Sequence, residues 1–388
     1  FAFHPDRLKM RASSRAVLAA AGLLVGTAAC SFPTRMEPAT PAPGGHCPLP
    51  NGPSVAERPP SDSDLRWYRA ADPRDVELAA RWCSTVGAAV LQLVPREGGV
   101  EWRPGDALQV ISWNMWIGGG DLLRFLSYEL GVDCSVGGRG VSGTKPFVLL
   151  LQEVWRYSAD LPEVEGSRII PFTIDPDRAQ GESPDIVEAA KRCGLALAYV
   201  PSARNGPDDG LRPHEDKGNA VLSNLPLTDP IAFDLPLEGG RKVAVAATLA
   251  MPEGRTIRVV ALHLDVASTL LRTLLTGNQT RLRQAMGLVD GLARAAADGL
   301  AVDATVVGAD MNTWASNESA FRRMLQAFPG SPPWDGRATR SGFPTDHIFF
   351  RVESDASIGV IGYARIENRY GSDHHARRLY VVSRSATR

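Results

Sequence analysis

From residue 105 onward, the chain alternates short apolar runs with polar loops and with longer stretches that are apolar on one side only. The strand-length apolar runs are residues 107–113, 147–152, 195–200, 219–223, 242–250, 256–264, 304–310, 346–350 and 378–382. The stretches with helical spacing are residues 122–130, 184–192, 278–297 and 318–328. This pattern predicts many strands with helices between them.

Two neighbouring runs indicate how some of the strands are arranged. Residues 242–250 and 256–264 are separated by a short segment that contains Pro252, Glu253 and Gly254, which favours an antiparallel hairpin. A purely parallel sheet would contain no such pair. We therefore expect mixed sheets in an α/β fold.

Residues 1–30 have the features of an export signal. Arg11 and Arg15 precede an uncharged apolar run, residues 16–29, which ends in small residues before Cys30. This run is shorter than the roughly 20 apolar residues that a membrane-spanning helix needs. We therefore expect a signal segment, with an N-terminal anchor or a chance apolar stretch as the alternatives.

Cys30 follows its small neighbours in a way that resembles the bacterial lipoprotein box, although Thr27 stands where Leu is usual. Lipidation of Cys30 would attach the protein to a membrane, and simple secretion is the alternative. The sequence thus predicts an exported protein, either a membrane-anchored lipoprotein or a secreted one.

Residues 31–104 are predicted to form a linker and an N-terminal extension. Residues 31–60 are rich in Pro, Gly and Ala and lack periodic apolar positions, which predicts a flexible tether. Residues 72–86 predict one helix, with Asp72 as its cap and Gly87 just after its end.

The remaining cysteines are Cys47, Cys83, Cys134 and Cys193, an even number that is compatible with two disulfides in an exported chain. Pairing of Cys47 with Cys83 and of Cys134 with Cys193 is favoured because each pair brackets one loop-rich region. The other two pairings and four unpaired thiols stay open. No Cys-x-x-Cys spacing indicates a zinc site.

Composition limits the classes of function only weakly. The chain has 388 residues, of which 44% are hydrophobic and 22% charged, and this is ordinary for a globular protein. The formal net charge of -1 provides no overall basic field that would draw the protein onto nucleic acid, although a local basic groove stays open. We expect a monomer.

Polar groups stand at the ends of the predicted apolar elements. They are Asn114, Glu153, His263, Asp310 with Asn312, and the pair Asp373 and His374 that precedes the final strand. Buried strands tolerate charged groups only when these are paired or bound to a metal. Because such groups stand at the ends of several apolar elements, we expect them to meet in one polar site. Carboxylate and amide oxygens with imidazole suit Mg²⁺ or Mn²⁺ better than a soft metal.

The ordered set of short motifs resembles the endonuclease/exonuclease/phosphatase superfamily, which includes deoxyribonuclease, abasic-site endonuclease, neutral sphingomyelinase and inositol-polyphosphate 5-phosphatase. The matching pieces are Trp113-Asn114, Gln152-Glu153, His263-Leu264, Gly308-Ala309-Asp310-Met311-Asn312, Thr345-Asp346-His347-Ile348-Phe349 and Ser372-Asp373-His374. The resemblance covers residues 106–388. It implies a four-layer α/β/β/α sandwich of two mixed sheets with outer helices, and a catalytic domain over residues 105–388.

The resemblance also implies roles for single residues. Glu153 matches the principal metal-binding glutamate, Asn114 an amide oxygen in the same coordination sphere, and Asp373 a further metal or water ligand. Taken singly, each of these side chains could equally serve as an ordinary polar group in a turn or loop.

The resemblance assigns the catalytic roles to the other matching residues. Asp310 would orient or deprotonate the attacking water, and Asn312 would orient the phosphate or serve as an amide of the metal site. Asp346 would hold the ring of His374, which stabilises developing charge or acts as the acid and base, and His263 would contact the phosphate or the leaving oxygen. An Asx turn at Asp310 and a buried structural histidine at His263 are the alternatives.

Other polar residues near these motifs are predicted to lie outside the chemistry. His347 and His375 are expected to pack or to face solvent, because neighbours in a strand point to opposite faces. Lys217 could meet a substrate phosphate, but a solvated loop lysine is the favoured interpretation. Arg281 is expected to lie on the charged face of an outer helix. Gly308 would leave room for a close approach of other groups.

The substrate is left open among nucleic acid, phospholipid and inositol phosphate. The neutral net charge weighs against a dedicated DNA enzyme. The segment Phe343-Pro344-Thr345-Asp346-His347 lacks the Trp and the Arg of the inositol 5-phosphatases. A degenerate, non-catalytic surface protein that binds a phosphate-bearing ligand or a protein partner is the alternative from another class.

Overall fold

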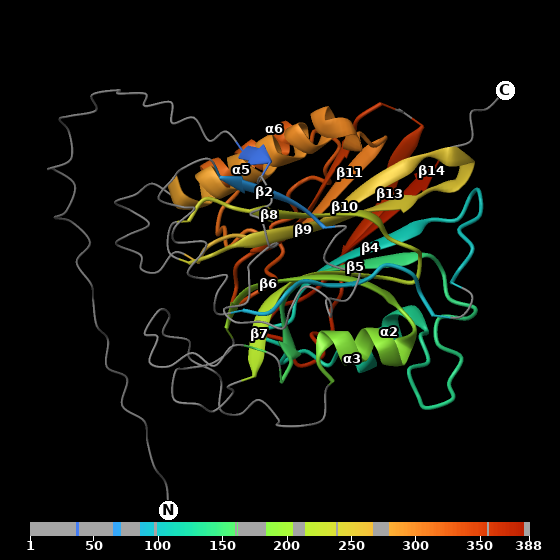
Figure 1. The fold of residues 1–388 in the computed structure, drawn as a ribbon. Coiled ribbons are helices and arrows are strands. Elements are labelled where there is room, and N and C mark those ends of the chain that lie inside the picture. The colour runs from blue at the N-terminus through green and yellow to red at the C-terminus, as the bar shows by residue number, and fades with distance from the viewer. Residues whose placement is uncertain are drawn as a thin grey trace, which may run out of the picture. The chain divides into compact units, whose positions relative to one another are not determined.

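The strand patterns produce two mixed seven-stranded sheets that pack face to face in a computed structural model of the chain (Figure 1). The model describes residues 36–38, 65–70, 86–96, 99–159, 161, 184–204, 214–237, 240–266, 279–354 and 357–383. All of these residues belong to one compact unit, Thr34–Arg388.

Sheet A has the strand order β1-β2-β8-β9-β10-β11-β12. Its strands are β1 (Met36–Pro38), β2 (Arg66–Ala70), β8 (Thr228–Asp234), β9 (Val243–Ala250), β10 (Thr256–His263), β11 (Ala304–Asp310) and β12 (Asp346–Val352). The β10–β11 and β2–β8 pairs are parallel, and the other pairs are antiparallel.

Sheet B has the strand order β13-β14-β4-β5-β7-β6-β3. Its strands are β13 (Ile358–Arg365), β14 (Arg377–Ser383), β4 (Leu108–Asn114), β5 (Phe147–Tyr157), β7 (Glu215–Ser223), β6 (Ala196–Arg204) and β3 (Val90–Gln92). Only the β4–β5 pair is parallel among these strands.

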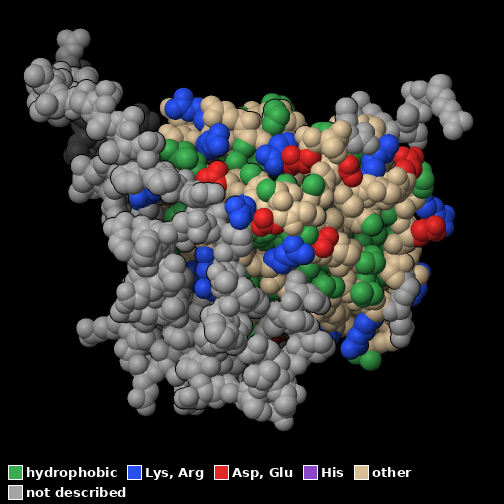
Figure 2. Space-filling model, turned by 45° about the horizontal axis from the view of Figure 1, so that its top comes forward, with side chains coloured by type: hydrophobic (Ala, Val, Ile, Leu, Met, Phe, Trp, Pro, Cys, Tyr) green, Lys and Arg blue, Asp and Glu red, His purple; other side chains and the backbone are tan. Residues whose placement is uncertain are grey.

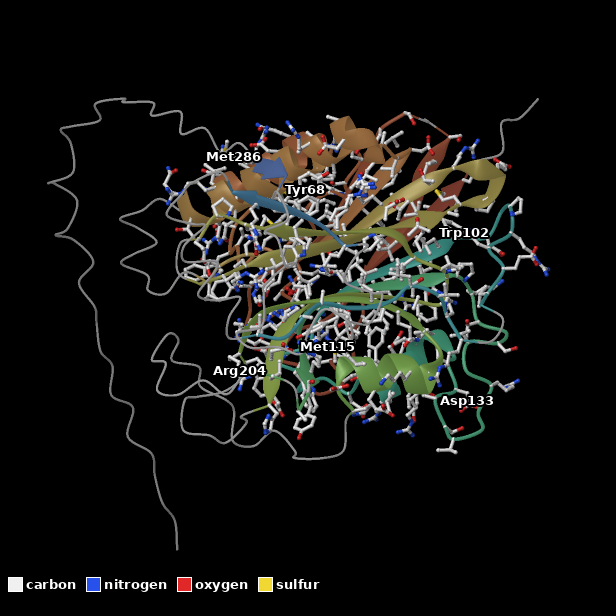
Figure 3. The ribbon with its side chains drawn as sticks, viewed as in Figure 1. Tyr68, Trp102, Met115, Asp133, Arg204 and Met286 are labelled. Atoms are coloured by element: carbon white, nitrogen blue, oxygen red, sulfur yellow. A yellow bond between two sulfur atoms is a disulfide. The ribbon has the colours of Figure 1, made fainter. Side chains whose placement is uncertain are left out.

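Helices cover the outer face of each sheet, which completes the predicted four layers. In Figure 1, α5 (Gln279–Ala295) and α6 (Ser319–Ala327) lie over sheet A, and α2 (Leu122–Leu130) and α3 (Ile186–Cys193) lie under sheet B. Each outer layer has its own apolar cluster, and a third cluster fills the space between the sheets. Figure 3 shows Tyr68 on the side of α5 and Met115 on the side of α3.

Local signals fix the ends of the helices as the sequence predicts. At the start of α2, the side chain of Asp121 accepts a hydrogen bond from the backbone N–H of Arg124, and at its end Gly131 has a φ of 71°. The helix α3 is capped in the same way by Asp185 and Gly194. Among the described residues, no helix is both long and apolar enough to span a membrane.

Most predicted strands are confirmed, and the differences have physical reasons. The predicted hairpin is the antiparallel β9–β10 pair. The sequence pattern missed the start of β7 at Glu215, because Asp216 there is buried and paired with Arg156. It also missed β13, which contains two glycines and is half-exposed along most of its length.

The N-terminal predictions are only partly within the described residues. The tether predicted for residues 31–60 was wrong at Met36–Pro38, which pairs with β2 and forms the edge strand of sheet A. The strands β2 and β3 extend both sheets with residues that precede the predicted catalytic domain. The signal segment, Cys30 and nearly all of the helix predicted for residues 72–86 lie outside the described residues.

One of the two predicted disulfides is present. Cys134 and Cys193 form a disulfide that joins the loop before β5 to the end of α3. Cys47 and Cys83 lie outside the described residues. The favoured pairing is therefore confirmed for Cys134 with Cys193.

Gly308 of β11 lies against sheet B with no room for a side chain, which agrees with the close approach that the sequence predicts. A Cβ atom at this position would lie 2.8 Å from Ser112 Cβ and from Leu150 Cδ1, which both belong to sheet B. The carbonyl of Gly308 also accepts a hydrogen bond of 3.2 Å from Gln152 Nε2 across the layer. A side chain at residue 308 would therefore force the sheets apart.

We expect Gly308→Ala to lower the free energy of unfolding by about 1–3 kcal/mol, the usual cost of overpacking a core. Urea unfolding followed by circular dichroism measures this. Gly99→Ala is the matched control, because a Cβ there meets its nearest atoms at 3.4 Å. Equal stability of the two variants would contradict the close approach at Gly308.

Candidate active site

Polar side chains replace the apolar ones at one end of the layer between the sheets. Val259 and Ala261 of β10 lie in this layer. His263 is the next residue on the same face because side chains alternate along a strand. In β11, Val306 lies in the layer and the same alternation places Asp310 there. The apolar core therefore ends in ionisable groups.

Strand pairing aligns these groups in rows. In sheet A, His263 is opposite Asp310, and Asp310 is opposite Asp346. In sheet B, Asn114 is opposite Gln152. Asn114 Nδ2 donates a hydrogen bond of 2.8 Å to Asp310 Oδ2, and this bond joins the two rows across the layer.

Asp310 is the central residue of the site. It is fully buried, and its Oδ1 accepts a hydrogen bond of 2.9 Å from the backbone N–H of Asn312. Its Oδ2 lies 3.7 Å from His263 Nε2 and 3.9 Å from His374 Nε2. One carboxylate therefore contacts groups carried by both sheets.

Glu153 reaches the site through an irregularity in β5. Leu150 faces the layer between the sheets, so regular alternation would turn Glu153 toward the outer face. The β5–β7 register shifts between Leu151 and Val154, and Glu153 has a φ of 53°. A bulge of this kind re-aims a side chain. Glu153 Oε1 accordingly lies 3.7 Å from His263 Nε2.

His374 and Asp346 form the predicted carboxylate–imidazole pair. His374 Nδ1 lies 2.7 Å from Asp346 Oδ2, which also accepts a hydrogen bond of 2.9 Å from Thr345 Oγ1. The backbone N–H of His374 donates to Ser372 Oγ, and the Ser372 hydroxyl donates to the carbonyl of Asn114. The segment before β14 is thereby fixed against the end of β4.

The remaining predicted residues lie beside this pair. Asp373 Oδ2 is 2.9 Å from Arg340 Nε, and its Oδ1 is 3.6 Å from His374 Nε2. Asn312 has a φ of 49°, and its Nδ2 donates a hydrogen bond of 2.9 Å to the carbonyl of Leu264. The structure thus brings all of the predicted site residues together.

The charge of His374 follows from its surroundings. Burial alone would lower its pKa, but the charge and hydrogen bond of Asp346, with Asp310 and Asp373 nearby, raise the pKa of His374 to about 9. The same pairing outweighs burial at Asp346 and lowers the pKa of that carboxyl. His374 is therefore an imidazolium near neutral pH.

The pKa values of Asp310 and Glu153 are shifted in opposite directions, although burial raises both. Burial and the nearby charge of Asp346 raise the pKa of Asp310 to about 6, against the lowering effect of His374. At Glu153, burial is outweighed by cationic neighbours, which lower its pKa to about 2. Glu153 therefore stays ionised, and Asp310 can take up a proton close to neutral pH.

His263 carries no charge near neutral pH. Burial and the ammonium group of Lys242, whose Nζ lies 3.4 Å from His263 Nε2, hold the pKa of His263 well below its usual value. Because His263 is neutral, the pKa of Glu153 is lowered by the charges of Lys217, Lys242 and His374. A neutral imidazole favours hydrogen bonding by His263 over proton donation.

The prediction for Lys217 was wrong. Lys217 lies in β7 opposite Trp155 of β5, and only 6% of the residue is exposed. Burial and the charge of Lys242 lower its pKa to about 7, although Glu153 opposes this. No sequence pattern indicated burial, because β7 begins with charged residues. Lys242 and Arg340 are also site residues that the motifs did not identify.

Two other expectations can be compared with the structure. His347 packs between Trp334 and Phe321, with ring centroids 4.9 Å and 4.6 Å away, so its packing role is confirmed. Arg281 is not on a solvated helix face. It is buried and its Nη2 lies 2.7 Å from Glu318 Oε2, which ties α5 to the start of α6.

The donor set fits a hard divalent cation. Glu153 is ionised, and its charge together with burial raises the pKa of Asp373, so a cation near both carboxylates would relieve their repulsion. Asn114 Oδ1 accepts one hydrogen bond from the backbone N–H of Trp116 and keeps a second lone pair for a metal.

A second group could also hold a cation. Asp310, Asp346 and His374 each place one ligand atom within 4.8 Å of the others. His374 is protonated and hydrogen-bonded to Asp346, however, and a metal ligand must be deprotonated. The Glu153 side of the site is therefore the better place for a metal.

Sequence comparison agrees with this arrangement. A family model described as the endonuclease/exonuclease/phosphatase family matches residues 111–374, which include every predicted site residue. The chain belongs to the endonuclease/exonuclease/phosphatase family. Comparison with curated protein sequences gives no significant match.

Solved structures of endonuclease/exonuclease/phosphatase proteins are similar to the chain at low identity. The protein of this family from Beutenbergia cavernae DSM 12333 is 16% identical over 72% of each chain, with a TM-score of 0.45. The human Nocturnin catalytic domain with bound sulfate is 18% identical over 73% of this chain and 96% of that one, with a TM-score of 0.44. Sphingomyelinase C from Streptomyces griseocarneus is 14% identical over 71% of this chain and 99% of that one, with a TM-score of 0.39. None of these similarities indicates a substrate.

We expect His374 to titrate near pH 9 in histidine NMR spectra, and its pKa to fall toward or below 6.5 in Asp346→Asn. Because its folded pKa is raised, the stability gained from protonated His374 is fully present below pH 6.5 and is lost as the pH rises through 9. The neighbouring His375, whose pKa is lowered, serves as the control in the same spectra. A His374 resonance that titrates near 6.5 in both proteins would contradict the ion pair.

Proposed function

We propose that the protein is a divalent-metal-dependent phosphoesterase that cleaves a P–O bond by in-line attack of water. The observation that carries this proposal is the position of Asp310, whose Oδ2 lies 3.7 Å from His263 Nε2 and 3.9 Å from His374 Nε2. A carboxylate in this position can orient a water molecule, while the neutral and the protonated imidazole beside it can hold a phosphate oxygen. Membership of the family supports hydrolysis of phosphate esters in general.

Glu153, with Asn114 and Asp373, would hold Mg²⁺ or Mn²⁺. When bound, the cation would neutralise charge on the phosphoryl group and on the leaving oxygen. The bulge that turns Glu153 inward leaves its carboxylate little freedom, which suits a metal ligand.

The protein groups provide the other requirements of the reaction. Asp310, with a pKa of about 6, can accept a proton from the attacking water. His374 presents a positive charge that is fixed by Asp346 and does not need to reorganise during the reaction. Neutral His263 can donate one hydrogen bond to a phosphate oxygen, and Asn312 holds the turn on which Asp310 depends.

The substrate remains a phosphate ester of nucleic acid, phospholipid or inositol phosphate. On the face drawn in Figure 2, basic and acidic side chains are interspersed, and the described residues form no long basic track there. Export of the protein, and its attachment to a membrane through lipidated Cys30, are further proposals that rest on the sequence of residues 1–30 alone.

We expect hydrolysis of bis-p-nitrophenyl phosphate with Mg²⁺ or Mn²⁺, and loss of the activity with EDTA. Glu153→Gln should lower the rate at least about 100-fold at fixed metal concentration, because it removes a charged metal ligand. Glu101→Gln, at an exposed carboxylate that pairs with surface Arg103, is the matched control. Absence of turnover with either metal would favour the alternative, a non-catalytic protein that binds a phosphate-bearing ligand.

We expect His374→Ala to lower kcat by roughly 10²–10⁴-fold, which is the usual contribution of such a group. His375→Ala replaces the neighbouring histidine, whose ring lies against Arg369 Nε and the carbonyl of Ile366, and should retain activity. Circular dichroism checks that both variants fold. Equal activity of His374→Ala and the unsubstituted protein would remove His374 from the mechanism.

A further inference from the structure

Two lysines reach the candidate active site, and the proposed mechanism uses neither. Lys217 lies in β7 with only 6% of its surface exposed. Lys242 directly precedes β9, and its Nζ lies 3.4 Å from His263 Nε2. Both lysines interact with the charge of Glu153 and with each other.

The strand order places the lysines on one side of the site. In sheet B, β7 lies on the far side of β5 from β4 and β14, and in sheet A, β9 lies on the far side of β10 from β11 and β12. His374 precedes β14, and Asp346 begins β12. The imidazolium and the two ammonium groups therefore approach Glu153 and Asp310 from opposite sides.

The backbone holds the two lysines close to one another across the layer. Asn219, two residues after Lys217, donates a hydrogen bond of 2.5 Å from Nδ2 to the carbonyl of Val243, the residue after Lys242. Arg241, the residue before Lys242, donates to Asp234 Oδ1 and to the carbonyl of Pro201. Lys242 thus extends from a segment that is anchored on both sides.

Charge balance at the site favours a substrate with two negative charges. The carboxylates Glu153, Asp346 and Asp373 face the cationic groups His374, Arg340 and Lys242, and the pair Asp310 and Lys217 titrates close to neutral pH. A divalent cation adds two positive charges that no described carboxylate at the site balances. Two ammonium groups beside one carboxylate also repel each other, and bound anionic oxygens would relieve this.

We propose that Lys217 and Lys242 bind a second negative charge of the substrate beside the phosphate charge that faces His374. This inference rests on the proposed function and specifies its substrate class. The second charge has two sources: the scissile group itself in a phosphate monoester, or an adjoining phosphate in a diester. A diester with a single charge fills only part of the site.

Substrate pairs that differ by one charge test the proposal. With Mg²⁺, p-nitrophenyl phosphate is compared with bis-p-nitrophenyl phosphate, and a thymidine dinucleotide is compared with and without a terminal phosphate. A higher kcat/KM for the monoester identifies the scissile group as the source of the second negative charge. A higher kcat/KM for the phosphorylated dinucleotide identifies an adjoining phosphate as that source. No preference for the more charged member of either pair overturns the proposal.

Substitution of the two lysines tests whether Lys217 and Lys242 cause the preference for the more charged substrate. Lys217→Met and Lys242→Met should each lower kcat/KM for the preferred dianion by about 10–100-fold, the usual value of a charge-assisted hydrogen bond, and should affect singly charged diesters much less. Lys242→Arg should restore most of the preference. Lys145→Met, at an exposed lysine 3.8 Å from Asp106, is the control. An equal fall for both members of a pair overturns the proposal, and Lys242→Met suffices for this outcome if Lys217→Met does not fold.

Binding of inorganic phosphate separates this inference from the proposed function. Calorimetric titration of the metal-loaded protein with phosphate should show binding that weakens about 10–100-fold in either Met variant. Lysine-dependent phosphate binding without hydrolysis of any ester contradicts the proposed function and supports the anion site. Glu153-dependent hydrolysis with phosphate binding unaffected by both variants supports the function and overturns the inference.

Discussion

The buried ion pair between Asp346 and His374 is the interaction on which the rest of the site depends. It connects the start of β12 in sheet A with the segment before β14 in sheet B, and both residues are almost inaccessible to solvent. A buried pair adds little net stability, because desolvation offsets the attraction, but loss of one partner costs roughly 3–5 kcal/mol. The pair therefore fixes the relative position of two sheets more than it strengthens the fold. That position sets the distance from His374 to Asp310.

The site departs from the rules that shape the rest of the core. Elsewhere between the sheets the side chains are apolar, and Gly308 lets the strands come close. At the polar end, carboxylates and cations are buried together, and their pKa values diverge: about 2 for Glu153, about 6 for Asp310 and about 9 for His374. With such different pKa values, two carboxyl groups of one site can have separate roles, one as a permanent charge and the other as a proton acceptor. Shifted pKa values of this kind are typical of functional sites.

Much of this arrangement could be predicted from the sequence because it follows from alternation along strands. In the runs before His263 and before Asp310, alternate apolar residues point into the layer between the sheets. The polar residue that ends each run continues this alternation and therefore points into the same layer. The motifs then supplied the pairing of Asp346 with His374. The same reasoning predicted the close approach at Gly308, because a residue without a side chain inside an apolar strand indicates contact with another element.

What the sequence could not predict depends on contacts between distant segments. Simple alternation would turn Glu153 away from the site, and only the bulge between Leu151 and Val154 returns it. The burial of Lys217 requires that β7 begin at Glu215, and this start depends on Asp216 being neutralised by Arg156 and Tyr199.

Backbone conformation and charge are linked at two residues of the site, Glu153 and Asn312. Glu153 and Asn312 both have positive φ, a conformation that costs free energy for residues other than glycine. At Asn312 the turn is stabilised by its own N–H, which donates to Asp310 Oδ1. At Glu153 the charge lies beside Lys217 and Lys242, so electrostatic attraction favours the inward side chain that the bulge requires. A cation bound by Glu153 would compete with these lysines for the same carboxylate, and an anionic substrate would then replace Glu153 as their partner. The strained residue would then couple metal binding to the availability of the lysines.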